Sequence, residues 1–586
     1  MSDTYSSPEL PEETRDVSRR TALKLGATAG VAAALASRHA GAQEQDYPPP
    51  TPPPEPAVCS TRPTNSPATR PFVHALPIPP AAVPSSTLFP APARVANLAF
   101  GEAPRADHQR WNEFLPHFHF NVSARPAMHQ FHPDIPPSYV WSFNGIVPGP
   151  TFIAYYDHPI IIRFRNDLPV NHTGYGINEI TTHLHNGHTA SESDGFAGDY
   201  YGPGLWKDHH YPNVLAGYDQ YPPKGDAREA MHTLWYHDHR HSFTAPNTYR
   251  GLTGMYLLFD DKDTGNERDT RPGALRLPSG YGVYDIPLIL GDKIFCPDGQ
   301  LWAVPSGFFQ TGDKWVVNGA IQPFFNVQRR KYRFRIVNTG PLQDYVLRLS
   351  DGRPFKVIAT DGNLLEHPLD ATELPIGIAE RFDVIIDFSN LAIGASLSLA
   401  NNQAQFVGNA PDPEPIPGFP VENLILRFNV VANPPFPDVS QVPATLCTYP
   451  PVNLNEIARV RTWDFDFIGG QMKINGLIFD PDRSDANVRT GNTEKWILRN
   501  KVPLAFWTHP VHIHFEEFRV LSFNGAPPSP LQSGRKDVLN LRPENEAEIF
   551  IRFRDFRGKY QIHCHRMNHE DNFMLTRWDI GDNFPA

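Results

Sequence analysis

The chain has 586 residues, 62 prolines and a formal net charge of −11, from 52 Lys and Arg against 63 Asp and Glu. A chain of this length rarely folds around one core, so we expect three domains of ordinary size. The negative charge argues against a nucleic-acid partner and, more mildly, against binding to an anionic membrane. The many prolines favour turns and strands over long helices.

The N-terminus carries a targeting signal. Residues 18–21 (Ser-Arg-Arg-Thr) form a twin-arginine pattern, an apolar run follows from Leu25 to Ala36, and residues 40–42 (Ala-Gly-Ala) form a small-residue cleavage site. The apolar run is too short to anchor the protein stably in a bilayer. We therefore expect residues 1–42 to be a twin-arginine signal peptide. The mature protein is then periplasmic or secreted, with no stable membrane anchor.

Three stretches are predicted to be connections. Residues 43–70 form a proline-rich linker, because seven prolines between Pro48 and Pro56 favour an extended polyproline spacer. A partner-binding role for this linker is the alternative. Tyr200–Lys224 and Ala410–Pro420 are rich in Gly and Pro and are expected to be long, irregular loops.

The rest of the chain contains an internal repeat at the scale of a domain. An Asn-Gly pair, which is a hairpin signal, occurs three times, and each copy is followed by a predicted strand that ends in Asn. The pairs begin at Asn144, Asn318 and Asn475, and the strands end at Asn166, Asn338 and Asn500. The repetition, without long amphipathic helices, predicts an all-β protein of three Greek-key β-sandwich domains. We place these domains at residues 71–265, 266–435 and 436–586.

The motif with the clearest chemistry lies near the C-terminus. Cys564 stands between His563 and His565, with His569 and Met574 following. Residues 559–562 are predicted to be a strand, along which successive side chains point to opposite faces. Cys564 should therefore face one way and its two histidine neighbours the other. A thiolate, imidazoles and a weak axial Met are the ligands of a blue-copper electron-transfer centre.

Three further segments supply the remaining ligands. His509 is expected to complete the blue centre with Cys564, His569 and Met574. One His-x-His pair alone is weak support for a metal site, but four such segments, one of them containing Cys564, make chance a poor explanation. Eight histidines remain for a three-copper cluster: His183, His185, His237, His239, His512, His514, His563 and His565. These segments avoid residues 266–435, so we expect the cluster between domains 1 and 3, with domain 2 as a spacer.

These segments resemble those of multicopper oxidases, and most of all the bacterial three-domain branch of spore-coat laccases, bilirubin oxidases and phenoxazinone synthases. Residues 72–79, 129–145 and 193–195 support that branch, and the resemblance covers roughly residues 71–586. It implies three cupredoxin domains and four copper ions. His183 and His512 would hold the type 2 copper, and the blue centre would be type 1. The type 3 pair would be held by His185, His237, His239, His514, His563 and His565.

The resemblance also implies catalytic roles beyond metal binding. Cys564 would conduct electrons to the cluster, while Asp194 and Glu570 would lie beside the cluster and its oxygen route as candidate proton relays. The partners implied are dioxygen and a small aromatic reductant, and the protein is expected to be a monomer. The implied activity is a laccase-type oxidation coupled to four-electron reduction of dioxygen to water.

Two departures from the family pattern concern the substrate rather than the ligands. Residues 186–188 are Asn-Gly-His where related laccases usually have Gly-Gly or Gly-Ser, and Glu516-Glu517 replaces an apolar pair. We expect the two glutamates to lie on the exposed side of a strand, with a metal-ion substrate site as the alternative. A bilirubin oxidase and a manganese or cuprous oxidase are further alternatives, although the seven scattered Met argue against cuprous ion.

Functions of other classes stay open at this point. A blue-copper carrier without oxidase activity, a copper nitrite reductase and a copper-free structural protein share the expected β-rich fold, and the copper bound per chain distinguishes them. The cysteines add one constraint. Cys564 cannot be both a copper ligand and part of a disulfide, so at most one disulfide forms among Cys59, Cys296 and Cys447, and the sequence does not choose the pair.

Overall fold

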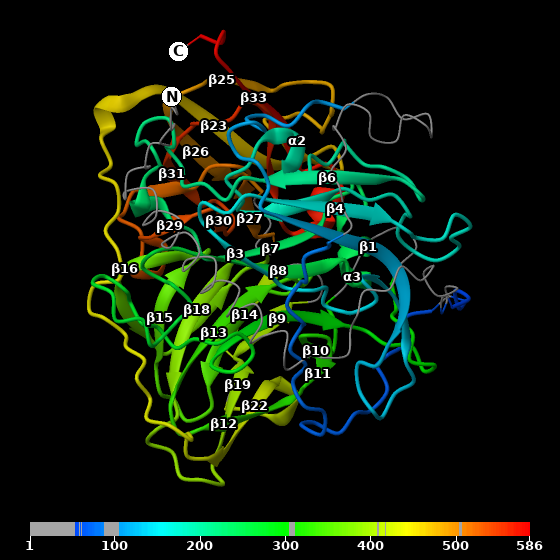
Figure 1. Cartoon of the computed structure of the whole chain (residues 1–586). Helices are drawn as coiled ribbons and strands as arrows, with labels where there is room; N and C mark the ends of the chain where they lie inside the picture. The colour runs from blue at the N-terminus through cyan, green and yellow to red at the C-terminus, as the bar shows by residue number, and fades with distance from the viewer. Residues whose placement is uncertain are drawn as a thin grey trace, which may run out of the picture. The chain divides into compact units, whose positions relative to one another are not determined.

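The computed structural model describes residues 53–57, 59, 61–86, 105–303, 311–406, 410–415, 418–502 and 507–585. The expected signal peptide, residues 1–42, therefore lies outside the described residues, as does the first part of the expected linker. The described chain is mostly β-strand with a few short helices (Figure 1). None of the helices described is long and apolar enough to cross a membrane.

The first pair of sheets is formed between residues 118 and 259, with strand orders β2-β1-β4-β6 and β3-β8-β7-β5. Side chains of both sheets, including Trp141, Phe164, Tyr236 and Tyr256, share one apolar core. The elements are β1 (Phe118–His129), β2 (Ser138–Phe143), β3 (Phe152–Tyr155), β4 (Ile160–Asn166), β5 (Thr182–His185), α2 (Ser191–Asp194), β6 (Trp206–Tyr211), η3 (Ala227–Glu229), β7 (Thr233–Asp238), α3 (Thr244–Arg250) and β8 (Thr253–Phe259).

The second pair has the orders β11-β10-β9-β13-β18-β15-β16 and β12-β22-β19-β14-β17, and β20 and β21 form a separate two-stranded sheet. Phe334 and Val384 of one sheet share a core with Leu347 and Phe428 of the other. The elements are β9 (Asp285–Lys293), β10 (Lys314–Val317), β11 (Ala320–Ile321), β12 (Phe324–Gln328), β13 (Lys331–Asn338), β14 (Tyr345–Leu349), β15 (Phe355–Thr360), β16 (Asn363–Ala371), β17 (Leu374–Ile376), β18 (Arg381–Asp387), β19 (Ser396–Asn401), β20 (Gln403–Phe406), β21 (Ala410–Pro415), η4 (Val421–Asn423) and β22 (Leu424–Ala432).

The third pair has the orders β24-β23-β26-β31-β28-β29 and β25-β33-β32-β27-β30. Its core joins Trp463 and Trp496 to Ile562 and Trp578 and includes Cys564. The elements are η5 (Leu454–Glu456), β23 (Ile457–Ile468), β24 (Gln471–Ile474), β25 (Ala486–Arg489), β26 (Thr493–Asn500), β27 (His509–Ile513), β28 (Phe518–Phe523), η6 (Pro530–Gln532), β29 (Arg535–Lys536), β30 (Val538–Leu541), β31 (Glu546–Arg552), β32 (Gly558–Cys564), α4 (Met567–Asp571) and β33 (Leu575–Gly581).

The three pairs of sheets confirm the predicted all-β fold of three Greek-key sandwiches. Each sheet pair lies within one of the three ranges expected from the sequence, although the domain boundaries themselves stay predictions. Two expectations about loops were wrong. Tyr200–Lys224 contains β6, which pairs with β4, and Ala410–Pro420 contains β21. In the first case the strand, Trp-Lys-Asp-His-His-Tyr, has no apolar alternation and stands among Gly and Pro residues, so the sequence pattern did not indicate it.

Two asparagines accept the same backbone hydrogen bonds in every repeat. This shared structural role explains why the repeat is visible in the sequence. The first has a positive φ and precedes a glycine of positive φ, as a two-residue hairpin turn requires. Its side-chain oxygen accepts a backbone hydrogen bond from a neighbouring strand, and the pairs are Asn144 with Ser123, Asn318 with Ile289 and Asn475 with Asp464, all at 2.8 Å. The second asparagine accepts from the N–H two residues later, at Asn166, Asn338 and Asn500.

The described part of the expected linker is fastened to the folded chain. Glu55 accepts hydrogen bonds from His172 at 2.8 Å and from Arg250 at 3.0 Å. A disulfide joins Cys59 to Cys296, with a Cα–Cα distance of 6.4 Å, and Cys447 and Cys564 are free thiols. The sequence allowed three pairings and the structure selects this one. Such a cross-link typically contributes about 2–4 kcal/mol to the free energy of unfolding.

Candidate metal centre

The histidine motifs lie side by side because of the strand register. β5 pairs with β7 so that His183 faces His237, and β27 pairs with β32 so that His512 faces His563. The donor atoms gather into groups whose members all lie within 4.8 Å of one another. Four of these groups consist of His and Cys alone: His509 with Cys564 and His569, His239 with His514 and His563, His185 with His237 and His565, and His183 with His185 and His512. A fifth joins Asp194 to His183 and His514. All these side chains are buried.

Cys564 and two histidines form a triangle of donor atoms. The Cys564 Sγ lies 3.3 Å from His509 Nδ1 and 3.6 Å from His569 Nδ1, and the two nitrogens are 3.1 Å apart. Burial raises the pKa of the Cys564 thiol above its ordinary value, so a bound cation is needed to hold the thiolate. Two imidazoles and one cysteine in this arrangement are the donor set of a blue-copper centre.

Two more residues lie next to this triangle in the fold. Met574 is fully buried in the core that contains Cys564. Its carbonyl accepts from the Cys564 N–H at 3.0 Å, and its own N–H donates to the backbone carbonyl of His569 at 2.9 Å. Trp507, which the sequence reasoning missed, is partly exposed and its ring centroid lies 5.4 Å from that of His569. An aromatic side chain therefore connects the buried triangle with the surface.

The group of His239, His514 and His563 shows a uniform orientation. The Nε2 atoms converge, with His563 Nε2 3.1 Å from that of His514 and 3.3 Å from that of His239. The Nδ1 atoms face carboxylates instead. His514 Nδ1 is 2.7 Å from Asp194, and Glu570 lies 3.2 Å from His563 Nδ1 and 3.5 Å from His239 Nδ1. Carboxylates in this position fix the tautomer and ring orientation of metal-binding histidines.

The group of His185, His237 and His565 has ring centroids 5.1–5.9 Å apart. His237 Nδ1 donates to the Asp238 carbonyl at 2.8 Å, which leaves its buried Nε2 without a hydrogen-bond partner. Neither nitrogen of His565 has a partner. In His185 the Nε2 lies 3.0 Å from Asp537 Oδ2, and neither ring nitrogen makes a hydrogen bond.

The remaining pair is His183 and His512. Their Nδ1 atoms donate to the backbone carbonyls of Asp194 at 2.5 Å and Asp537 at 2.9 Å. The Nε2 atoms therefore carry lone pairs, and they face each other at 3.4 Å. Two lone pairs at this distance repel unless a cation lies between them.

Asp194 reaches both rings because of the glycine that follows it. Asp194 ends the short helix α2, and Gly195 has a φ of 87°. A Cβ at Gly195 would lie 2.6 Å from His183 Cα and still closer to the Thr182 backbone. Only glycine lets this turn lie flat on β5, which brings Asp194 against the ligand strand. The Ser193-Asp194-Gly195 motif thus has a steric basis.

The electrostatics of the site suit a cation with nitrogen and sulfur ligands. Burial lowers the pKa of His237 and His509 to about 3 and that of His239 to about 4, and it lowers the pKa values of His183, His185, His512, His514, His565 and His569 well below the ordinary value. Neutral imidazoles are the form that binds metal. Buried nitrogens without hydrogen-bond partners, converging beside carboxylates, therefore fit copper.

The pKa values of the two acidic residues expected at the cluster shift in opposite directions. Burial raises the pKa of Asp194 well above its ordinary value, with Lys207 opposing weakly. Burial also raises the pKa of Glu570, but the nearby His563 and His239 outweigh it, so the pKa of Glu570 lies below its ordinary value. Thr244 donates to Glu570 at 2.7 Å and fixes it against α3.

The two departures from the family pattern contact each other. Glu516 and Glu517 are buried, so the expectation that they lie on an exposed side was wrong. Asn186 donates to Glu517 at 2.8 Å, and Glu516 pairs with Arg554 at 3.1 Å. A buried carboxylate needs such partners to stay charged. Since their oxygens are engaged by the protein, the structure gives no support to a metal-ion substrate site here.

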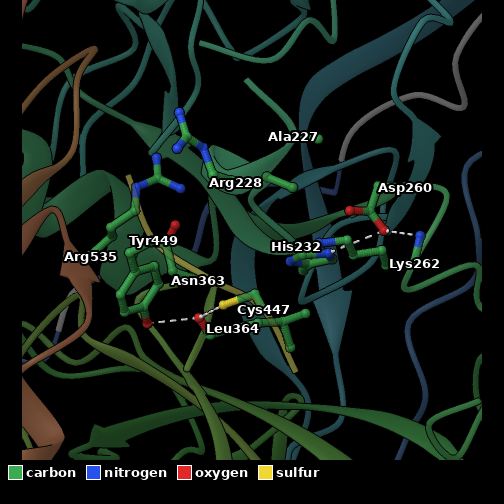
Figure 2. Close-up of a pocket in the computed structure, with 11 residues that line it drawn as sticks. Ala227, Arg228, His232, Asp260, Lys262, Asn363, Leu364, Cys447, Tyr449 and Arg535 are labelled. Carbon is green, nitrogen blue, oxygen red and sulfur yellow. Dashed lines mark hydrogen bonds and ion pairs between the residues drawn. The ribbon is translucent and has the colours of Figure 1, made fainter. Parts of the chain in front are cut away.

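A small pocket near this region explains the remaining free cysteine (Figure 2). The Cys447 thiol and the Tyr449 hydroxyl both donate to the Leu364 carbonyl, at 3.2 and 2.8 Å. Burial raises the pKa of Cys447 to about 12, so it is a neutral thiol. None of the expected copper ligands lines this pocket. Cys447 is therefore a structural residue, separate from the metal groups.

Comparison with known proteins agrees with this donor set. Family models described as multicopper oxidase match residues 127–263, 300–409 and 449–583. The chain is 34% identical to a bilirubin oxidase of Albifimbria verrucaria, over 79% of this chain and 76% of that protein. It is 30% identical to a laccase of Bacillus subtilis, over 79% of this chain and 94% of that protein.

Solved structures show the same fold. A multicopper oxidase from Pediococcus acidilactici superposes with a TM-score of 0.69 at 21% identity, over 89% of this chain and 93% of that one. A multicopper oxidase from Aquifex aeolicus gives a TM-score of 0.65 at 23% identity, over 80% and 97% of the two chains. With three family matches along its length and relatives of this similarity, the chain belongs to the multicopper oxidase family.

Proposed function

We propose that the protein is a laccase-like oxidase that takes electrons singly from phenolic or other small aromatic reductants and reduces dioxygen to water. Bound copper would supply the one-electron redox chemistry. The observation that carries the proposal is the division of three consecutive residues among three donor groups. Cys564 belongs to the Cys/His triangle, His563 to one three-histidine group and His565 to the other. Covalent bonds thus join the place of electron entry to the place of dioxygen reduction.

The donor groups support a proposal of four copper ions. His509, Cys564 and His569, with Met574 as a weak axial donor, would hold the type 1 ion, and His183 with His512 would hold the type 2 ion. The type 3 ions would be held by His239, His514 and His563, and by His185, His237 and His565. Separate sites for single-electron intake and four-electron reduction keep partly reduced oxygen bound.

The carboxylates at the cluster support a role in proton delivery. Reduction of dioxygen to water consumes four protons at a site from which the described chain excludes most solvent. We propose that Asp194 and Glu570, which contact His514 and His563, pass these protons inwards. Both carboxylates lie beside ligand rings, which places them next to the site where the protons are consumed.

The function is tested by copper analysis together with oxygen uptake. We expect four copper ions per chain and oxygen consumption with phenols and aminophenols. One or two copper ions would instead indicate a carrier or a nitrite reductase, and none a structural protein. The 34% identity to a bilirubin oxidase makes bilirubin the second candidate substrate. Bilirubin, manganese(II) and cuprous ion therefore belong in the same steady-state panel.

Met574→Leu tests the assignment of the axial donor. Removal of a weak thioether ligand stabilises the reduced ion, so we expect the reduction potential of the blue centre to rise. The blue absorption should persist, because the thiolate and the imidazoles remain. Redox titration measures the shift. A potential equal to that of the wild type would show that Met574 is a core residue and nothing more.

We also propose that the protein is exported folded and works outside the cytoplasm. The Cys59–Cys296 disulfide supports this, because such bonds persist in oxidising compartments. Replacement of Arg19 and Arg20 by two lysines should leave the protein in the cytoplasm, whereas the wild type should appear outside it with an N-terminus near residue 43. Fractionation and mass measurement read both results. Equal export of the two forms would contradict a twin-arginine signal.

A further inference from the structure

Asp537 was not singled out by its sequence context, yet it contacts the metal groups as Asp194 does. Its backbone carbonyl accepts from His512 Nδ1 at 2.9 Å, and its carboxylate Oδ2 lies 3.0 Å from His185 Nε2. Asp194 makes the corresponding contacts: its carbonyl accepts from His183 Nδ1 at 2.5 Å, and its carboxylate lies 2.7 Å from His514 Nδ1. Each aspartate thus holds one ring of the facing pair through its carbonyl and one ring of a three-histidine group through its carboxylate.

Asp537 is held by an arginine from the second sheet pair. Arg381 in β18 is fully buried, and its Nη1 donates to Asp537 Oδ1 at 2.7 Å. The same guanidinium donates to the Asp361 carbonyl at 2.9 Å and to the Thr233 carbonyl at 3.3 Å. One rigid fork therefore joins residues from all three sheet pairs, which a lysine cannot reproduce.

The backbone around Asp537 is fastened from the same side. Asp361, in the turn between β15 and β16, accepts from Lys536 Nζ at 2.8 Å and from the Val538 N–H at 3.3 Å. Both neighbours of Asp537 are thus tied to one carboxylate of the second sheet pair. The second sheet pair supplies no ligand among the described groups, but it fixes this segment of β29 and β30.

We propose that Asp537 is a positioning residue for His512 and His185, and that Arg381 keeps it in place. The inference rests on the proposed function, since it concerns rings proposed to bind copper. It gives the middle domain a role beyond that of a spacer, because the ligands of the third sheet pair are then aligned by the second. Loss of a carboxylate that orients ligand histidines typically weakens metal binding about 10- to 100-fold.

Asp537→Asn is the first test. The two carboxylate oxygens face Arg381 and His185, so an amide must turn its NH₂ group towards one of these donors. The carboxylate contacts His185, a ligand proposed for a type 3 ion, so we expect about 10- to 100-fold weaker retention of that copper ion when the loaded enzyme is titrated with a chelator. Copper per chain, measured at each chelator concentration, reads this loss. The blue absorption is the internal reference and should stay unchanged.

Arg381→Lys tests the support, with Arg333→Lys as its matched control. Arg333 is likewise buried and pairs with two carboxylates, Asp263 and Asp383. Neither carboxylate contacts a histidine of the proposed copper sites. Arg381→Lys should shift the chelator titration in the same direction as Asp537→Asn, and Arg333→Lys should leave it as in the wild type. An equal loss in both lysine variants would reduce the effect to general destabilisation and overturn the proposal.

The double variant shows whether Arg381 acts through Asp537. If it does, Arg381→Lys should add nothing to the loss already caused by Asp537→Asn, whereas independent effects would add. Full additivity, or a titration of Asp537→Asn identical to that of the wild type, would overturn the proposal. A wild-type protein that shows the blue absorption but no non-blue Cu(II) signal in electron paramagnetic resonance would overturn the proposed function itself. This measurement comes before any variant is made.

Discussion

Cys564→Ser is expected to abolish the intense blue absorption and the oxidase activity together. The absorption requires the thiolate, and the Cys564 Sγ is the sulfur atom within 3.6 Å of His509 and His569. The same residue carries the covalent connection to His563 and His565. The fold should persist, because a hydroxyl in place of a thiol at this buried position is a change of one atom. Visible absorption and oxygen uptake measure the two losses, and circular dichroism checks the fold.

Cys447→Ser is the matched control for that experiment. Cys447 is also a free thiol, but its partner is the Leu364 carbonyl, and it lines the pocket of Figure 2, whose lining includes none of the expected copper ligands. The Cys447→Ser variant should keep both the blue absorption and the oxidase activity. If Cys564→Ser also kept both, the blue centre would be elsewhere and the proposed electron entry would be wrong.

Features set by neighbouring residues could be predicted from the sequence. The Asn-Gly turns at Asn144, Asn318 and Asn475 depend on a local backbone conformation. Their repetition along the chain therefore predicted three similar sandwiches. The alternation of side chains along β32 likewise places Cys564 in a different donor group from His563. In both cases the geometry is fixed within a few residues, which is the range over which a sequence pattern carries information.

Features set by packing between distant segments could not be predicted. Asp537 lies 25 residues after His512 in the chain, and its importance depends on Arg381 from another sheet pair. Glu516 and Glu517 were predicted to be exposed, because charged residues usually are, but both are buried. Their partner Arg554 and the matching Asn186 become neighbours only in the folded chain. The disulfide could not be chosen for the same reason, since Cys59 and Cys296 are 237 residues apart.

Glu570→Gln should slow the reoxidation of the reduced enzyme by dioxygen by about 100-fold, the lower end of what a positioned acid or base contributes. Glu570 is the carboxylate that faces both His563 and His239, and it is the group proposed to take up each proton on its way to the cluster. Glutamine has nearly the same size and cannot take up that proton. Anaerobic reduction of the blue centre by substrate should be unaffected, because His569 and Cys564 are unchanged.

The measurement is stopped-flow reoxidation across a range of pH, with copper per chain determined for every sample. Asp571→Asn is the matched control, because Asp571 is an adjacent acid that caps α3 through Thr244 and Ala245 and contacts no ligand ring. It should reoxidise at the wild-type rate. A Glu570→Gln enzyme that had lost copper would show that Glu570 holds the rings in place. An enzyme with full copper and the wild-type rate at every pH would show that Glu570 carries no protons to the cluster.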